Sequence, residues 1–262
     1  MVITGAARGI GEATAGLLAS LGARVALGDL DTDLVRAVAE RVGGVSAHLD
    51  VTSPDSWREF LVAVESAGPV DVLVNNAGIM PLGAVLEEPD EVARKIIDVN
   101  VHGIINGTKA VGPGMAERGG GHVINVASAV GRIAVADGAT YSASKFAAVG
   151  FSEATRAELA PLGIDVTVVL PSIVRTELAA GVPDARGVRS VSAEDVAEVI
   201  ASAIRRPRPE LWVPTWAQPM ARSTALLPRR AQEAIARAFR ADRVLADADP
   251  AARAAYEARA RR

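Results

Sequence analysis

Three glycines close to the start of the chain place the strongest constraint on its fold. Residues 4–11 read TGAARGIG, follow the apolar pair Val2-Ile3, and lead into small and apolar residues of helical character up to Leu21. Glycines at this spacing let a backbone turn tightly and approach a pyrophosphate at the N-terminus of a helix. The pattern predicts a strand-to-helix turn, which is either a dinucleotide-binding turn or a plain connection.

Short apolar runs alternate with helical stretches through the rest of the body. We expect further strands at 24–29, 45–49, 70–74, 121–127, 164–170 and 211–213. We expect helices at 33–42, at 53–66 behind Ser53 and Pro54, at 90–118, around Tyr141 and Lys145, and from a capping box at Ser192 and Asp195 to Arg206. This alternation predicts an α/β fold, in which a doubly wound parallel sheet lies between two layers of helices as a three-layer αβα arrangement.

Asp29 and Arg8 bear on the choice of nucleotide. Asp29 ends the second expected strand, 18 residues after Gly11, where a carboxylate accepts the hydroxyls of an adenosine ribose and repels a 2′-phosphate. Arg8 lies inside the glycine turn, where a guanidinium is able to pair with that phosphate. We give Asp29 the greater weight and favour a solvated loop charge for Arg8, so the predicted cofactor is NAD while NADP stays open.

Tyr141 and Lys145 are four residues apart, so a helix places them on the same face, one turn from each other. A fixed ammonium close to a phenol lowers the pKa of tyrosine from about 10 towards the neutral range. Ser128, after the strand expected at 121–127, lies at the same edge of the sheet and is able to hydrogen-bond a substrate oxygen. The three residues predict a proton shuttle, and the alternative is an amphipathic helix without a catalytic role.

Two further polar motifs follow expected strands or lie inside helices. Asn75-Asn76-Ala77-Gly78 predicts a sharp turn at which the backbone passes close to a ligand or to another strand. Asn100 lies among valines and isoleucines, so we expect it to be buried and to find hydrogen-bond partners. It is either a structural polar bridge or the holder of a water molecule near the reacting groups.

In their order and spacing these motifs resemble the short-chain dehydrogenase/reductase family, in its single-domain branch. The resemblance covers about residues 2–214: the turn at 4–11 looks like the family's T-G-x-x-x-G-x-G, and the turn at 75–78 looks like its N-N-A-G. It implies a Rossmann fold and an NAD(P)-dependent oxidoreductase that interconverts a secondary alcohol and a ketone. Residues 1–216 are then the dinucleotide-binding and catalytic domain.

The resemblance also implies roles for individual residues. Tyr141 is expected to be the general acid and base, Lys145 to lower its pKa and bind the nicotinamide ribose, Ser128 to steady the substrate oxygen, and Asn100 to support a water-mediated proton relay. The expected cofactor-binding residues are Gly5, Arg8, Gly9, Ile10, Gly11, Asp29, Asp50 (adenine ring), Val51, Asn76, Ala77, Gly78, Tyr141, Lys145, Pro171, Val174 and Thr176 (carboxamide). The chain departs from the family in two places: Pro171-Ser172 stands for the usual Pro-Gly, and the short first strand predicts a start upstream of Met1.

Composition argues against several other classes of function. The chain has no cysteine, so it has no disulfide, no thiolate metal site and no cysteine nucleophile, and we expect no metal. Its net charge of −3 gives no reason to expect nucleic acid. No apolar run reaches the about 18 residues that a spanning helix needs, and no signal peptide opens the sequence, so we predict a cytoplasmic protein.

The last part of the chain has a different character from the body. Residues 217–262 contain ten arginines, no lysine and five acidic residues, which makes this extension +5 and the rest −8. Apolar residues recur there at near-helical spacing and predict two short amphipathic helices, broken around Pro228 and Pro250; they are Leu226, Leu227, Ile235, Phe239, Val244 and Leu245. The extension packs on the body or on a sister subunit, contacts a membrane surface, or stays solvated; we expect it to dock and shape the substrate entrance.

The loops expected over the substrate carry few charges, which predicts an apolar alcohol or ketone as substrate. Their apolar residues are Ile79, Met80, Pro81, Val130, Ile133, Val135, Val174, Leu178 and Val182. Two alternatives stay open: an NADP-dependent carbonyl reductase, and a non-catalytic protein that binds or senses a dinucleotide. The family resemblance further implies a homodimer or homotetramer.

Overall fold

A parallel β-sheet forms the centre of the protein in the computed structural model, which describes residues 1–184, 189–238 and 243–261. Within these residues the sheet has seven strands in the order β3-β2-β1-β4-β5-β6-β7, and neighbouring strands are parallel. The strands are β1 (Val2–Thr4), β2 (Ala26–Asp29), β3 (Val45–His48), β4 (Val72–Asn75), β5 (Gly121–Val126), β6 (Ile164–Pro171) and β7 (Glu210–Val213). The predicted doubly wound sheet is confirmed, and its order reverses between β1 and β4, where open α/β sheets bind ligands.

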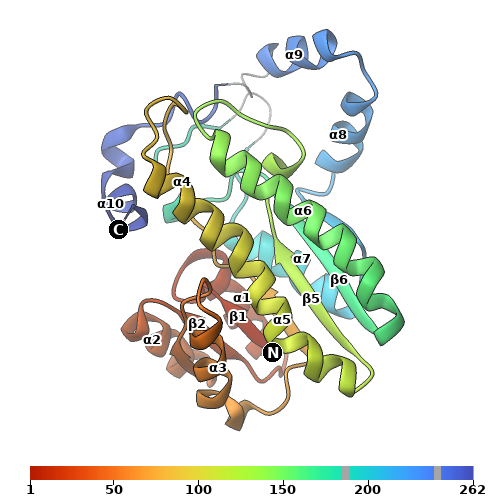
Figure 1. The fold of residues 1–262 in the computed structure, drawn as a ribbon. Coiled ribbons are helices and arrows are strands. Elements are labelled where there is room, and N and C mark those ends of the chain that lie inside the picture. Colours follow the sequence, from red (N-terminus) through yellow and green to blue (C-terminus); the bar gives the residue numbers. More distant parts are fainter. Residues whose placement is uncertain (185–188, 239–242, 262) are drawn as a thin grey trace.

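Helices cover both faces of the sheet and complete the three layers (Figure 1). They are α1 (Gly9–Ser20), α2 (Thr32–Val42), α3 (Pro54–Ala63), α4 (Asp90–Ile97), α5 (Gly103–Glu117), α6 (Ala139–Leu159), α7 (Ala193–Arg205), α8 (Ala217–Ala225), α9 (Arg229–Ala238) and α10 (Pro250–Ala260). The expected caps are present: Ser53 accepts from the N–H of Ser56, and Ser192 forms a capping box with Asp195. These local signals explain why the ends of α3 and α7 are readable from the sequence.

Two apolar cores lie on the two faces of the sheet because side chains alternate along each strand. In β4, Val72 and Val74 belong to the core beneath α1, α2 and α7, whereas Leu73 belongs to the core beneath α3 and α5. A third cluster, which includes Val168 and Leu170, lies beneath α6. Burial of one such side chain stabilises the fold by about 1.5–3 kcal/mol. The cores hold the carboxyl ends of the strands in place, where the predicted site lies.

The long helical region expected around Asn100 is interrupted at that residue. Helices α4 and α5 are joined by one turn of π-helix, Asp98–His102, and Asn100 is fully buried within it. A π turn inside a helix widens the backbone locally and often marks a functional site. The interruption directs Asn100 towards the interior of the protein.

The C-terminal extension differs from the prediction of two short helices. It contains three, α8, α9 and α10, within the described residues. Pro228 separates α8 from α9 as expected, but Pro250 begins α10 instead of breaking a helix, because proline is tolerated in the first turn and Asp249 caps it. Phe239 lies outside the described residues. No helix in the described parts of the chain is both long and apolar enough to span a membrane.

Candidate active site

The four predicted catalytic residues come from three neighbouring elements. Ser128 follows β5, Tyr141 and Lys145 lie in the first two turns of α6, and Asn100 lies in the π turn before α5. The exposed fractions of these residues are 9% for Ser128, 5% for Tyr141, 5% for Lys145 and 0% for Asn100. All four are therefore buried, which is unusual for a lysine unless the site requires it.

Asn100 connects the loop after β4 to α6. Its Oδ1 accepts from the backbone N–H of Ile79 at 2.8 Å, and its Nδ2 donates to the carbonyl of Ile79 at 2.9 Å and to Ser144 Oγ at 3.0 Å. A Cβ atom placed on Gly78 would lie 3.3 Å from Asn100 Oδ1 and 3.5 Å from Lys145 Nζ. Of the two interpretations offered by the sequence, these contacts favour a structural bridge beside the lysine.

Burial dominates the acid–base properties of Tyr141 and Lys145. It raises the pKa of Tyr141 to about 12, although a hydrogen bond with the Ser128 hydroxyl acts in the opposite direction. It also lowers the pKa of Lys145 to about 8. Lys145 Nζ lies 5.7 Å from the centre of the Tyr141 ring and donates to the carbonyl of Val126 at 3.2 Å. In the protein alone the net shift of the Tyr141 pKa is therefore upward, opposite to the expected lowering, because loss of solvation dominates.

The glycine turn has the backbone that the sequence predicts. Gly5 has φ +64° and Gly9 has φ +57°, a region that glycine enters without strain. A Cβ atom on Gly11 would overlap the carbonyl oxygen of Gly5 and lie 2.9 Å from the Cα of Ala6. The turn lies against the loop after β6, since a Cβ on Gly9 would be 3.1 Å from the methyl group of Thr176. The glycines leave no room for a Cβ atom in this turn, which is the tight strand-to-helix turn that dinucleotide-binding folds use.

Two carboxylates stand at the end of β2 beside that turn. Asp29 accepts from the backbone N–H groups of Ala7 and Asp31, both at 3.0 Å. Arg8 Nη2 lies 2.7 Å from Asp31 Oδ2, and Arg8 Nε lies 3.6 Å from Glu177. The Arg8 hydrogen bond is the main reason that the pKa of Asp31 is lowered. Arg8 is thus held between carboxylates, which corrects the expectation of a solvated loop charge.

The family model of short chain dehydrogenases matches residues 1–187. This chain belongs to the short-chain dehydrogenase family. A trans-4-hydroxycyclohexanecarboxylate dehydrogenase of Sinomonas cyclohexanicum is 37% identical over 192 residues, which are 69% of this chain and 74% of that protein. A 3-alpha-(or 20-beta)-hydroxysteroid dehydrogenase of Mycobacterium tuberculosis is 36% identical over 186 residues, 70% of this chain and 72% of that one.

A solved structure supports the same conclusion. A short-chain dehydrogenase/reductase from Burkholderia phymatum, in complex with NAD, aligns with a TM-score of 0.77 and 25% identity over 84% of this chain and 90% of that chain. The predicted family and Rossmann fold are confirmed. This short-chain dehydrogenase is an oxidoreductase that depends on a nicotinamide dinucleotide.

Several predicted cofactor residues of the dehydrogenase have structural partners. Asn76 Nδ2 donates to the carbonyls of Thr4 and Gly5 at 2.9 and 3.0 Å, so it supports the glycine turn from behind. Ala77 N–H donates to Thr4 Oγ1 at 3.0 Å. Asp50 Oδ1 accepts from both the N–H and the hydroxyl of Thr52. Val51 is buried in the core beneath α3 and α5, and its carbonyl accepts from Trp57 Nε1 at 3.3 Å.

The loop after β6 brings the remaining predicted residues to the same edge of the sheet. Pro171 ends β6, and its carbonyl accepts a long hydrogen bond of 3.5 Å from Ser128 Oγ. Ser172, which departs from the family's glycine, has a buried hydroxyl with no partner in the described part of the chain. Val174 is buried, and its carbonyl accepts from the N–H of Thr176 at 2.8 Å. Ile10 packs at the edge of the core beneath α1.

Sequence reasoning missed two residues of α10 that contact the loop after β4, next to the predicted site of the dehydrogenase. Tyr256 Oη accepts from the N–H of Met80 at 2.6 Å, and Arg253 Nη2 donates to the carbonyl of Met80 at 2.8 Å. The signal was present, because the two residues lie three apart on one face of a helix. The arginine-rich composition of the extension concealed it.

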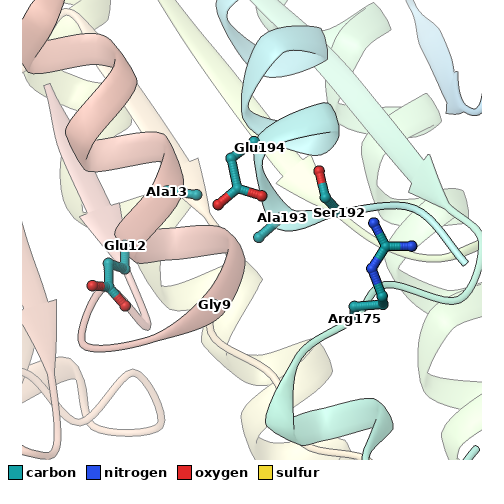
Figure 2. Close-up of a pocket in the computed structure, with 7 residues that line it drawn as sticks. All are labelled: Gly9, Glu12, Ala13, Arg175, Ser192, Ala193 and Glu194. Carbon is teal, nitrogen blue, oxygen red and sulfur yellow. The ribbon is translucent and has the colours of Figure 1, made fainter.

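The pocket drawn in Figure 2 lies outside the catalytic group. It has a volume of about 560 Å³ and comes from the start of α1, the start of α7 and the loop after β6; it is lined by Gly9, Glu12, Ala13, Arg175, Ser192, Ala193 and Glu194. Charges of both signs line it, and it shares only Gly9 with the predicted cofactor site. The pocket is therefore separate from the predicted catalytic residues around Tyr141.

Proposed function

We propose that this short-chain dehydrogenase interconverts a secondary alcohol and a ketone with NAD(H), and that Tyr141 is its general acid and base. The observation that carries the proposal is the convergence of Ser128, Tyr141 and Lys145 in one buried site at the carboxyl edge of the sheet. A protein that only bound the nucleotide would not need a buried phenol, hydroxyl and ammonium together. The alternative of a non-catalytic sensor is therefore less well supported.

Proton transfer is the chemistry that the chain's own residues supply. Tyr141 Oη takes the proton of the substrate hydroxyl in oxidation and returns it to the carbonyl oxygen in reduction. Ser128, which is hydrogen-bonded to Tyr141, donates to the same substrate oxygen and keeps it within reach. Lys145 is a buried cation that favours the phenolate when it forms. The nicotinamide ring, when bound, accepts or delivers the hydride.

The protonation of Tyr141 differs between the two directions. With a pKa of about 12, the phenol of the protein alone is protonated at neutral pH and ready to donate to a carbonyl. Oxidation requires that its pKa fall, which binding of the oxidised, positively charged nicotinamide next to Tyr141 and Lys145 would favour. Asn100, whose contacts fix Ile79 and Ser144, is a positioning residue in this account.

The groups at the end of β2 fit NAD better than NADP. The carboxylates of Asp29 and Asp31 lie at the end of β2, where the resemblance implies the adenosine ribose, and a 2′-phosphate bound there would be repelled; Arg8 is already paired with Asp31. Gly5, Gly9 and Gly11 form the tight turn before α1 that a pyrophosphate at the helix N-terminus needs. The family member from Burkholderia phymatum was solved with NAD. Adenine contact by Asp50 and carboxamide contact by Thr176 stay predictions.

The surroundings of Tyr141 support an apolar substrate. Met80, Tyr141 and Leu245 form one buried cluster, and its partly buried neighbours are Leu82, Val130, Val135, Leu178, Val182 and Val244. Two relatives are named as dehydrogenases of a hydroxysteroid and of a hydroxycyclohexanecarboxylate, both of which are cyclic alcohols. We infer that an uncharged cyclic alcohol or ketone fits the site of this chain.

Assembly, domain division and location stay predictions. Phe146 is exposed on α6, and a hollow of about 340 Å³ lies nearby between α4 and the start of α6, lined by Ala93, Arg94, Ile97, Asp98 and Thr140. A single exposed phenylalanine and a hollow with charged residues in its lining do not identify an interface, so the homodimer or homotetramer rests on the family resemblance, and light scattering on the purified chain would measure it. We propose that residues 1–216 are the dinucleotide-binding and catalytic domain, that residues 217–262 are a C-terminal extension, and that the protein is cytoplasmic.

Turnover of a panel of secondary alcohols with NAD tests the function. The panel contains a hydroxysteroid, uncharged hydroxycyclohexanes and a hydroxycyclohexanecarboxylate, and nicotinamide absorbance follows the reaction. We expect turnover of the uncharged rings and a loss of about a hundredfold in kcat/KM for Ser128→Ala, because the substrate oxygen loses a hydrogen bond. Ser223→Ala, at an exposed position of α8, is the control. Tight NADH binding without turnover of any alcohol or ketone would favour the sensor alternative.

A further inference from the structure

The C-terminal segment 243–261 returns to the catalytic site, although it lies outside the residues that the family model matches. In Figure 1, α8 and α9 extend from the body at the upper right, whereas α10 lies on the opposite side. Tyr256 is buried on α10, and its hydroxyl accepts from the N–H of Met80 at 2.6 Å. Met80 belongs to the same buried cluster as Tyr141. The segment therefore contacts the residues that surround the reacting group.

Arg253 holds this segment in place. It is 2% exposed, and its guanidinium donates to the carbonyls of Met80 at 2.8 Å, Leu178 at 3.0 Å and Ala180 at 3.1 Å. The remaining N–H groups face Glu257, with Nε at 3.0 Å and Nη2 at 3.0 Å from Oε1. All five donors are used, as a buried guanidinium requires. One side chain thus ties the loop after β4 to the loop after β6.

Further hydrogen bonds and an ion pair attach segment 243–261 to the same two loops. Glu257 accepts from the N–H of Leu82 at 3.3 Å, and Arg261 donates to the carbonyl of Leu82 at 2.8 Å. At the other loop, the N–H of Asp249 donates to the carbonyl of Gly181 at 2.9 Å. Arg259 is paired with Glu177, which also lies 3.6 Å from Arg8 in the glycine turn. The contacts are too specific for a solvated tail.

Leu245 brings an apolar side chain from this segment directly to the start of α6. It is buried in the cluster with Met80 and Tyr141. A Cβ atom on Gly138 would lie 2.7 Å from Leu245 Cδ1, so the leucine packs against the bare backbone three residues before Tyr141. Because Tyr141 is almost inaccessible beneath this packing, Leu245 limits the room beside its phenol.

We propose that Leu245 and Tyr256 are specificity-determining residues of the dehydrogenase, and that Arg253 is the positioning residue that holds them over Tyr141. The inference rests on the proposed function, since it takes Tyr141 as the place where the substrate reacts. Leu245 sets the size of substrate that is accepted. The Tyr256 hydroxyl accepts a hydrogen bond from the Met80 N–H, and its own O–H is left to donate to a substrate oxygen.

The same contacts define the chemical class of substrate. Arg253 is the buried cation of this segment, and its donors are all taken by carbonyls and by Glu257. A substrate carboxylate that faced this segment would therefore find no free cation on it and would lose its hydration. The segment selects uncharged rings and disfavours ring carboxylates.

Substrate selectivity of Leu245→Ala tests the inference directly. We expect kcat/KM for a hydroxysteroid to rise about tenfold relative to that for cyclohexanol, mainly through KM, because the shorter side chain leaves room. Leu226→Ala is the matched control, since that leucine is 87% exposed, and it should leave the ratio unchanged. Tyr256→Phe should raise KM more for substrates with a second oxygen than for cyclohexanol, because only the former lose a hydrogen bond from the phenol. An unchanged ratio in Leu245→Ala, with active enzyme, overturns the proposal.

A second measurement does not depend on turnover. The chain has two tyrosines, so in a Tyr256→Phe background ultraviolet absorbance reports the ionisation of Tyr141 alone. Adding Arg253→Met should lower the pKa of Tyr141 from about 12 towards the ordinary tyrosine value of about 10, because the segment no longer excludes water from the phenol. With Arg253→Lys in place of Arg253→Met, the pKa of Tyr141 should stay partly raised. Arg222→Met, the control, should leave this pKa unchanged. An unchanged Tyr141 pKa in Arg253→Met would contradict the proposal that the segment covers Tyr141. A lowered pKa together with a parent protein that turns over no substrate would support the covering of Tyr141 and contradict the proposed function.

Discussion

The hydroxyl of Tyr256 and the backbone N–H of Met80 are joined by a hydrogen bond of 2.6 Å across 176 residues of sequence. Met80 follows the Asn-Asn-Ala-Gly turn of the dehydrogenase core, and Tyr256 lies on its last helix. The bond places that helix beside the predicted active site. A hydroxyl that accepts from a buried backbone N–H also satisfies a group that would otherwise be costly to bury.

The buried ammonium of Lys145 should lower the stability of the dehydrogenase at neutral pH. Its folded pKa of about 8 lies below the ordinary value of 10.5, so the unfolded chain binds more protons between these values. Stability should therefore rise with pH from about 8 to about 10.5, and the charge costs ~3 kcal/mol below that window. Calorimetry of Lys145→Met should show a melting temperature several degrees above that of the parent at pH 7, with a smaller gap at pH 9.5.

The same variant should lose turnover, because a methionine cannot favour the phenolate of Tyr141. Lys109→Met, at an exposed position of α5, is the control and should change neither property. A Lys145→Met protein that melts below the parent at pH 7 would show that the bond to Val126 stabilises more than desolvation costs.

Two glycines of α1 should respond in opposite ways to alanine. Gly11→Ala places a methyl group onto the Gly5 carbonyl and close to Ala6, so it should abolish NADH binding. Gly16 lies on the same helix, and a Cβ atom there would meet no atom within 4 Å. Gly16→Ala should therefore stabilise the protein by about 0.5–1 kcal/mol. Fluorescence titration with NADH and thermal melts measure both effects. NADH affinity in Gly11→Ala equal to that in Gly16→Ala would contradict the assignment of the turn.

Cofactor choice should depend on Asp29 and on the partner of Arg8. We expect the parent to bind NADH at least tenfold more tightly than NADPH, because two carboxylates lie beside the ribose site. Asp29→Ala should reduce this preference by removing the repulsion, and Asp31→Ala should reduce it by freeing Arg8 for a phosphate. Asp33→Ala, an exposed position of α2, is the matched control. Tighter NADPH binding by the parent would give the carbonyl reductase alternative first place.

The sequence predicts the body of the fold well because its signals are local. The capping residues Ser53 and Ser192, the glycine turn and the apolar strands depend on neighbours within a few positions, and the structure confirms them. The alternation of strands and helices also predicts the position of Ser128 and Tyr141 at one edge of the sheet.

The features that were misjudged depend on partners far away in the sequence. Arg8 is paired with Asp31, a partner 23 residues away, instead of being solvated. The direction of the Tyr141 pKa shift follows from burial, to which Leu245 of the extension contributes. In the sequence Arg253 cannot be distinguished from the other arginines of the basic extension, because its carbonyl partners lie more than 70 residues away.

Steady-state kinetics of Tyr141→Phe, combined with NADH titration, tests the central claim most directly. The substitution removes one hydroxyl and keeps the ring, so the buried cluster around Met80 and Leu245 stays packed. We predict that kcat/KM for an uncharged cyclic alcohol falls at least about a thousandfold, while the Kd for NADH changes less than about twofold. A variant that turns over the alcohol as fast as the parent would contradict the role of Tyr141 as the general acid and base.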